Sequence, residues 1–294
     1  MSNKLGKIIV IAGSTSSGKT DLSIKLVKKF NGEIISADSR QIYKGMDIGT
    51  GKVTKKERQG IPHYLLDVAS PKKIFTVADY KRLAQKAIRE IQKKNKIPFL
   101  VGGTGFYIQS VIDNVVIPKV KPDWKLRKKL EKRSTQDLFR QLKKIDPQRA
   151  GLIDKNNKRR LIRALEIILK TKKPVPLLTT APIEFDILIL GIKKDNLKAR
   201  IAKRTQKMLK SGLEKETEKL VKKYGWVPNL KSIGYQEWKD FFEGKISKNE
   251  VEKLINQNTL NFAKRQMTWF KRDKRIIWIT NLKAALKAVE RFLA

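Results

Sequence analysis

The stretch IIVIAGSTSSGKTDLS, residues 8–23, constrains the fold of this chain more than any other part. Apolar residues 8–12 lead into Gly13, four small residues follow, and Gly-Lys-Thr completes the spacing G-x-x-x-x-G-K-[ST]. In chains with this pattern a strand precedes the loop, a helix follows it, and backbone N–H groups hold a phosphate. We therefore predict a strand over 8–12, a helix over 19–29, and a phosphate-binding loop made of Gly13, Ser14, Thr15, Ser16, Ser17, Gly18, Lys19 and Thr20.

Strands and helices continue to alternate on both sides of the middle of the chain. Buried strands are expected over 33–38 and over DILILGI, residues 186–192. A further strand is expected in IPFLVGGTG, residues 97–105, where it runs into a glycine-rich turn, and an amphipathic helix is expected over 78–94. A short strand, IIWIT, and a closing helix that ends at Leu293 follow near the C-terminus. This alternation predicts an α/β fold with a P-loop NTPase-like parallel sheet flanked by helices.

The middle of the chain has a different texture. Residues 119–173 carry 20 Lys and Arg against 6 Asp and Glu, a net charge of +14, and their apolar residues recur with helical spacing. We predict an inserted, basic, all-helical domain over 114–185, with residues 1–113 and 186–294 together forming the catalytic core.

The charge of the whole chain points to a polyanionic partner. Lys and Arg number 67 against 28 Asp and Glu, which gives a formal net charge of +39. So basic a chain attracts polyanions at long range, and nucleic acid is the first candidate. A genome rich in lysine codons would produce the same excess, because the lysines are spread along the whole chain. Composition alone leaves both readings open.

Several classes of protein are disfavoured by composition. There are no cysteines, which excludes disulfides and thiolate zinc sites. There is no run of about 18 apolar residues, so no transmembrane helix is expected. The first residues lead directly into a predicted strand, which leaves no room for a secretory signal. We expect a cytoplasmic protein without a membrane partner, and a monomer as the default.

Two polar groups follow predicted strands near the phosphate loop. Asp38 ends the strand EIISAD, and Thr104 lies in the glycine-rich turn GGTG after the next strand. The carboxyl ends of parallel strands form the ligand-binding edge of such sheets, so both should lie beside the loop. Asp38 could instead cap a helix or orient a Mg²⁺ shell, and GGTG could be a purely structural turn.

Seven motifs taken together resemble the tRNA dimethylallyltransferases from about Ile8 to Arg272: GSTSSGKT, SADSRQIYKGMDIGTGK, GIPHYLLDV, VGGTGFYI, RRLIRALEI, SIGYQEW and FAKRQMTWF. The resemblance implies transfer of a dimethylallyl group from dimethylallyl diphosphate to N6 of adenosine 37, beside the tRNA anticodon. The phosphate loop would then hold a diphosphate with Mg²⁺. Asp38 matches the family's base. Lys19, Thr20 with Mg²⁺, and Thr104 would stabilise the departing diphosphate.

The resemblance also implies contacts with the anticodon stem-loop of tRNA. The residues that match such contacts are Asp38, Ser39, Arg40, Gln41, Thr104, Arg127, Arg159, Arg160, Arg163, Lys264 and Arg265, with Gln266 beside the last two. A solvated helix face would also explain the four arginines of the insertion. Trp269 and Phe270 are expected in the core, and His63 in a turn-stabilising hydrogen bond.

Three other functions compete with this reading. Enzymes that transfer the same group to a free adenine nucleotide share most of the motifs, but gain little from a basic insertion. A nucleotide or shikimate-type kinase shares the loop, but does not need the stretch 36–51. A non-catalytic RNA-binding protein accounts for the charge, but not for a phosphate loop, Asp38 and Thr104 at one edge.

Overall fold

The computed structural model describes residues 6–177, 179–183 and 185–294. The chain divides into two compact units, one made of Met1–Asn114 with Pro182–Ala294 and the other of Val115–Ala181. The insertion predicted over 114–185 differs from the second unit by one residue at its start and four at its end. Each unit has an apolar core of its own.

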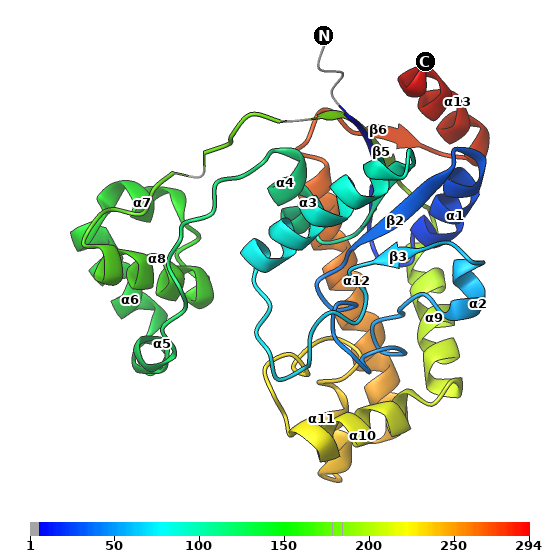
Figure 1. Cartoon of the computed structure of the whole chain (residues 1–294). Coiled ribbons are helices and arrows are strands. Elements are labelled where there is room, and N and C mark those ends of the chain that lie inside the picture. The colour runs from blue at the N-terminus through cyan, green and yellow to red at the C-terminus, as the bar shows by residue number, and fades with distance from the viewer. Residues whose placement is uncertain (1–5, 178, 184) are drawn as a thin grey trace. The chain divides into compact units, whose positions relative to one another are not determined.

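The first unit is built on a parallel sheet whose strands lie in the order β3-β2-β4-β1-β5-β6 (Figure 1). The strands are β1 (Gly6–Gly13), β2 (Gly32–Ala37), β3 (His63–Tyr64), β4 (Ile97–Gly102), β5 (Phe185–Ile192) and β6 (Ile277–Ile279). Every neighbouring pair is parallel. The predicted α/β fold with a parallel sheet is confirmed.

Helices cover both faces of this sheet. Side chains alternate along a strand, so Ile9 and Ile11 of β1 face one core while Ile8, Val10 and Ala12 face the other. The first core is closed by α1 (Lys19–Lys29) and α13 (Leu282–Leu293). The second is closed by α3 (Val77–Lys93), α4 (Gly105–Ile112) and the last residue of α12 (Lys248–Phe270). Central strands buried on both faces explain the continuous apolar runs of the sequence.

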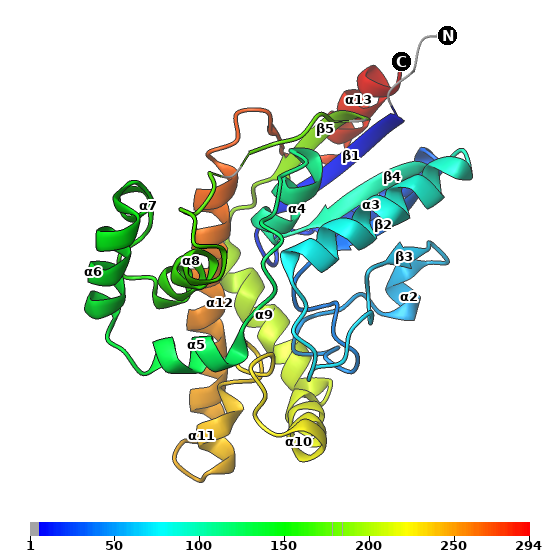
Figure 2. The ribbon, with the colours of Figure 1, turned by 60° about the vertical axis from the view of Figure 1, so that its left-hand side comes forward.

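A third core lies beyond the carboxyl edge of the sheet. In Figures 1 and 2, α9 (Leu197–Lys210) and α12 run side by side away from the sheet towards α10 (Leu213–Tyr224) and α11 (Trp238–Phe242). Ile42, Tyr43 and Met46, from the segment after β2, pack among these helices. The residues that follow Asp38 are therefore anchored on a helical layer distant in sequence.

The second unit is helical. It contains α5 (Trp124–Glu131), α6 (Thr135–Ile145), α7 (Pro147–Leu152) and α8 (Lys158–Thr171), and an isolated bridge joins Val115 to Thr180. Each helix is preceded by a residue whose side chain accepts a hydrogen bond from a backbone N–H of the first turn. These capping residues are Asp123, Ser134, Asp146 and Asn157 respectively. Leucines from α5, α6 and α8 form its core. Its described residues contain no strand, as predicted.

Three short elements were not predicted from the sequence: β3, α2 (Lys55–Arg58) and α11. Two to five residues are too few to show a hydrophobic period, and β3 exists only because Ile34 and Ile35 of β2 offer it a partner. Across the described ranges, no helix is both long enough and apolar enough to cross a bilayer.

Candidate active site

The site is assembled by the register of three neighbouring strands. Gly102 at the end of β4 lies opposite both Ala12 of β1 and Ala37 of β2. The phosphate loop, Asp38 and Thr104 therefore leave the sheet at one edge. Position 102 must be glycine here, because a Cβ atom would lie 2.2 Å from the Ala37 carbonyl oxygen.

The phosphate loop offers hydrogen-bond groups that no protein atom uses. Ser16 has a φ of 59° and Gly18 a φ of 92°, so the loop turns back on itself before α1 begins. The N–H groups of Ser16, Gly18, Lys19 and Thr20 have no acceptor among the described residues. The Oγ atoms of Ser16 and Ser17 are likewise buried without a partner. Buried polar groups left this way need a ligand, and their N–H donors suit an anion.

Lys19 lies at the centre of this loop. Its Nζ donates to the Ser14 carbonyl oxygen at 2.6 Å, which holds the ammonium beside the unpartnered N–H groups. Burial and then the positive charge of Arg204 lower the pKa of Lys19 to about 8, while the Asp38 carboxylate opposes the shift. A bound anion would raise the pKa of Lys19 again, so the surroundings of this lysine favour a negatively charged ligand.

Two arginines of α9 reach the same loop. Arg204 donates from Nη1 to Thr15 Oγ1 at 2.9 Å and from Nη2 to the Thr50 carbonyl oxygen at 3.1 Å. Arg200 donates from Nε to the Ser16 carbonyl oxygen at 2.7 Å. Neither was predicted from the sequence as a site residue. Both lie one turn apart on the helix after β5, the strand beside β1, and that spacing was the available signal.

Asp38 and Thr104 adjoin each other through a short hydrogen-bond network. The Asp38 Oδ1 accepts the N–H of Arg40 at 2.8 Å, and Thr104 Oγ1 accepts the N–H of Ser39 at 3.0 Å. The Thr104 N–H donates to the Ala37 carbonyl oxygen at 3.1 Å. No described residue bonds to Asp38 Oδ2. One carboxylate oxygen is thus fixed while the other is available to a substrate.

The comparisons with known proteins agree with this geometry. The family model described as IPP transferase matches residues 41–273. A curated tRNA dimethylallyltransferase of Acetivibrio thermocellus is 43% identical, covering 94% of this chain and 92% of its own length. Another, from Prochlorococcus marinus, is 40% identical over the full length of both chains. The chain belongs to the IPP transferase family. It is therefore a prenyl-transferring transferase.

Solved structures of the family share the fold. The tRNA isopentenylpyrophosphate transferase of Bacillus halodurans is 36% identical with a TM-score of 0.72, over 99% of this IPP transferase and 96% of that chain. A eukaryotic dimethylallyltransferase acting on tRNA is 31% identical with a TM-score of 0.78, over 95% of this chain and 75% of its own. The reading of the seven motifs as those of this family is confirmed.

Gln266 has a different role from the RNA contact predicted for it. It is 7% exposed, its Oε1 accepts the Thr15 N–H at 2.8 Å, and its Nε2 donates to the Gly103 carbonyl oxygen at 2.8 Å. It therefore ties the phosphate loop to the GGTG turn inside the IPP transferase core. Its neighbours Lys264 and Arg265 are exposed on α12. Sequence position beside two cations gave no sign that the amide turns inward.

Arg127 and Arg163 are engaged inside the insertion, where a contact with tRNA was predicted. Both guanidinium groups bond to the fully buried Glu166, and Arg163 also donates to the Val120 carbonyl oxygen. Burial alone would raise the pKa of Glu166, but bonds from Arg127, the Asp123 N–H and Arg163 lower it. Arg127 joins α5 to α8, and Arg163 joins α8 to the segment before α5. A buried carboxylate needs such partners, so both arginines have a structural role. Their contact with tRNA stays a prediction.

The remaining predicted residues occupy varied positions. Arg159 and Arg160 are exposed on the first turn of α8. Gln41 donates from Nε2 to the Gly51 carbonyl oxygen at 3.2 Å, and Thr20 is exposed at the start of α1.

The residues predicted to be structural are confirmed as such. His63 Nδ1 bonds to the Ile61 carbonyl oxygen at 2.8 Å, and burial lowers the pKa of His63. Phe270 is in the core, and Trp269 packs against it.

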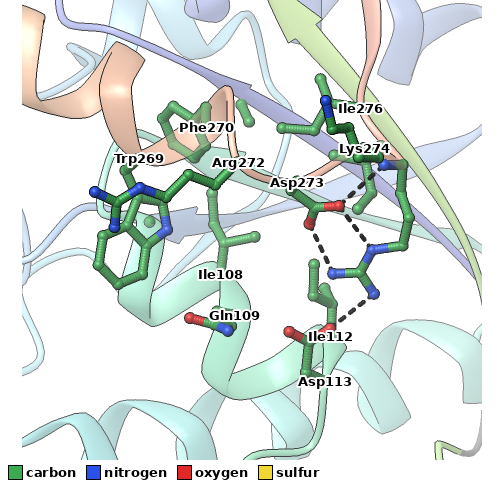
Figure 3. A pocket seen from close by; sticks show the side chains of 14 residues that line it. Ile108, Gln109, Ile112, Asp113, Trp269, Phe270, Arg272, Asp273, Lys274 and Ile276 are labelled. Carbon is green, nitrogen blue, oxygen red and sulfur yellow. Dashed lines mark hydrogen bonds and ion pairs between the residues drawn. The ribbon is translucent and has the colours of Figure 1, made fainter. Parts of the chain in front are cut away.

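A cavity of about 410 Å³ adjoins the site on the α4 side of the sheet (Figure 3). Ala12 and Gly105 line it near the phosphate loop, and isoleucines form its apolar floor. Arg275 bonds to Asp113 at 2.8 Å and Asp273 at 2.7 Å, which ties the end of α4 to the turn after α12. Among the described residues that line it, none is a predicted site residue. We assign the chemistry to the sheet edge rather than to this cavity.

The lowered pKa of Lys19 predicts how donor binding depends on pH. Protonated Lys19 attracts the diphosphate, and in the free protein it loses its proton as the pH rises past about 8. Dimethylallyl diphosphate keeps its full charge there, because its last proton leaves near pH 6. Calorimetry should therefore show Kd rising by up to about tenfold per pH unit above pH 8. Lys19→Arg, which does not titrate, should give a flat profile; a sloping one would mean another group is responsible.

Proposed function

We propose that this IPP transferase moves a dimethylallyl group from dimethylallyl diphosphate to N6 of adenosine 37 in tRNA, giving N6-isopentenyladenosine and diphosphate. The observation that carries the proposal is a phosphate loop with polar groups that have no partner among the described residues, together with Lys19 and Asp38 at the same edge of the sheet. The full-length relatives named as tRNA dimethylallyltransferases support the acceptor. None of these relatives is named for a free nucleotide.

The phosphate loop accounts for the donor half of the reaction. Its free N–H groups and the buried hydroxyls of Ser16 and Ser17 would bind the diphosphate oxygens. As the bond between C1 of the dimethylallyl group and oxygen breaks, its electron pair goes to the diphosphate. Lys19 and Arg204 both adjoin the loop, and as fixed cations they would stabilise that charge without reorganising. Thr104 would add a hydroxyl.

Asp38 accounts for the acceptor half. The amino group of adenine is a weak nucleophile, because its lone pair is delocalised into the ring. As N6 forms its bond to C1, it must lose one proton. Asp38 Oδ2 has no partner among the described residues and can accept that proton, while the Arg40 N–H holds Oδ1 in place. The base must leave its stack to reach this edge.

We propose Mg²⁺ as the metal of this site, with Thr20 as the protein ligand. The exposed Thr20 hydroxyl at the start of α1 is the oxygen donor that Mg²⁺ prefers. No three acidic or histidine side chains gather as a metal site in the part of the chain that the structure describes. That fits an ion held by few protein oxygens and by substrate phosphates. When bound, Mg²⁺ would neutralise charge on the diphosphate.

The acceptor is proposed to be the anticodon stem-loop, bound in part by the insertion. The net charge of +14 over 119–173 suits a phosphate backbone, and Arg159 and Arg160 are exposed for contact. Ser39, Arg40 and Gln41 follow Asp38 and would lie near the target base. We propose a monomer as the working unit. The absence of cysteine from the sequence suits a proposed cytoplasmic location.

Transfer of radiolabel tests the function directly. Labelled dimethylallyl diphosphate, Mg²⁺ and unmodified tRNA are incubated with the protein, with AMP as a parallel acceptor. We expect label in tRNA alone, and none when guanosine replaces adenosine 37. Label in AMP would favour the free-nucleotide reaction. If neither acceptor is labelled and added ATP is hydrolysed, the loop binds a nucleoside triphosphate instead.

Replacement of Asp38 tests the base. Asp38→Ala should lower kcat by roughly 10²-fold or more and change tRNA affinity by no more than about threefold. Asp38→Asn is the sharper variant, because its amide oxygen can still accept the Arg40 N–H but cannot take a proton. Single-turnover transfer measures both. If Asp38→Asn retains activity while Asp38→Ala loses it, Asp38 orients the loop and another group accepts the proton.

Replacement of Arg160 tests the insertion. Arg160→Ala should weaken tRNA binding and reduce the slope of log K against log salt by about 0.7–0.9, as expected for one lost phosphate contact. Filter binding at several salt concentrations gives the slope. Arg291→Ala, an exposed arginine on α13, removes the same charge as a control. Equal slopes for Arg160→Ala and the wild type would remove Arg160 from the interface.

A further inference from the structure

One partly buried carboxylate, that of Glu216, has no part in the reaction just described. Glu216 of α10 accepts the N–H groups of Asp47 at 3.3 Å, Ile48 at 2.8 Å and Gly49 at 3.1 Å. It also accepts the phenolic O–H of Tyr235 at 2.7 Å. Three successive N–H groups that converge on one point form a nest that holds an anion, and here the protein supplies the anion.

The surroundings of this carboxylate are closely fitted. Gly49 lies against the fully buried Tyr235, and a Cβ atom at position 49 would be 2.5 Å from its ring. A Cβ atom at Gly234 would be 2.7 Å from the Gly49 carbonyl oxygen. Burial and then the charge of Glu216 raise the pKa of Tyr235, so its phenol remains a donor. Close packing and hydrogen bonds thus hold residues 47–49 in a fixed position against α10.

The next two residues of the same loop reach the active site. The Thr50 carbonyl oxygen accepts Arg204 Nη2 at 3.1 Å, and the Gly51 carbonyl oxygen accepts Gln41 Nε2 at 3.2 Å. A Cβ atom at Gly51 would overlap the Arg204 guanidinium, at 1.9 Å from Nη2. Arg204 in turn donates to Thr15 of the phosphate loop. Glu216 is therefore connected to the phosphate loop through its bond to the Gly49 N–H, the backbone from Gly49 to Thr50, and the two bonds of Arg204.

We propose that Glu216 is a positioning residue for the diphosphate donor, acting through the Thr50 carbonyl and Arg204. This role rests on the proposed function. The Arg204 guanidinium is held between two neutral oxygens, and it faces the like charge of Lys19. If residues 47–49 left α10, the Thr50 carbonyl would move with them. Arg204 would then lose one of the two bonds that aim it at the diphosphate.

Matched variants separate positioning from stability. Glu216→Ala leaves three N–H groups without their acceptor, whereas Glu216→Gln keeps one oxygen and should restore part of the effect. Glu214→Ala is the control, because Glu214 lies on the same helix and, among the described residues, its carboxylate pairs only with Lys248 at the surface. Tyr235→Phe removes only the phenolic hydroxyl, and serves if the Glu216 variants fail to fold.

Steady-state kinetics of labelled transfer give the first test. Glu216→Ala should raise KM for dimethylallyl diphosphate roughly tenfold, with KM for tRNA within about twofold of the wild type. Glu216→Gln and Tyr235→Phe should raise it less, and Glu214→Ala should not change it. Unchanged KM values with a lower Tm would show that Glu216 only stabilises the fold. A rise in KM for tRNA alone would assign the loop to the acceptor and overturn the proposal.

A double-mutant cycle tests the route through Arg204. If Glu216 acts by aiming Arg204, adding Glu216→Ala to Arg204→Lys should raise KM for the donor by less than about twofold more. If the effects of Glu216→Ala and Arg204→Lys on KM for the donor are fully additive, Glu216 does not act through Arg204.

Calorimetry with dimethylallyl diphosphate and no tRNA separates this inference from the proposed function. A weaker Kd in Glu216→Gln, with faster hydrogen exchange at residues 47–49, supports the positioning role whichever acceptor the enzyme uses. Faster exchange with an unchanged Kd overturns it. A wild-type protein that binds the donor but transfers nothing to tRNA would overturn the proposed acceptor alone.

Discussion

The close approach of three strand ends is the constraint on which the site depends. Gly102 lies opposite Ala12 and Ala37, and any side chain there would collide with the backbone of β2. Because the strands are parallel, their carboxyl ends reach the same edge and deliver the phosphate loop, Asp38 and the GGTG turn together. Gln266 then fixes the loop to the turn from α12. This geometry places the phosphate loop and Asp38 side by side at the carboxyl edge of the sheet.

The charges at the carboxyl edge of the sheet favour the binding of a polyanion. Lys19 and Arg204 are close enough for their repulsion to lower the pKa of Lys19, and Asp38 is the acid that opposes it. Repulsion between fixed cations costs free energy, and a bound diphosphate would relieve it. Under the proposed function, the same two cations would also stabilise the charge that develops as the diphosphate leaves. Asp38 would then accept the proton of the acceptor.

Much of this was predictable from local sequence. The loop motif, the strand-helix alternation and the position of Asp38 and Thr104 after strands are short-range signals, and the structure places all of them as expected. Partners distant in the chain were not predictable. Arg204 reaches Thr15 across 189 positions and Gln266 reaches it across 251. Among 67 cations, the one-turn spacing of Arg200 and Arg204 after β5 was the only signal, and it did not show that their guanidinium groups turn towards the phosphate loop.

The fate of the acids bears on the charge of +39. Buried Glu166 forms ion pairs with two arginines of the insertion. Glu33 forms ion pairs with Lys94 and Lys96, and Lys52 forms ion pairs with two aspartates. Other carboxylates, such as those of Asp146 and Glu216, accept backbone N–H groups and neutralise no cation. The formal charge of +39 is what remains after every one of the 28 acids is counted, so it follows from the composition of the chain. Excess charge therefore explains attraction to a polyanion in general, while the choice of nucleotide must come from the few groups around Asp38.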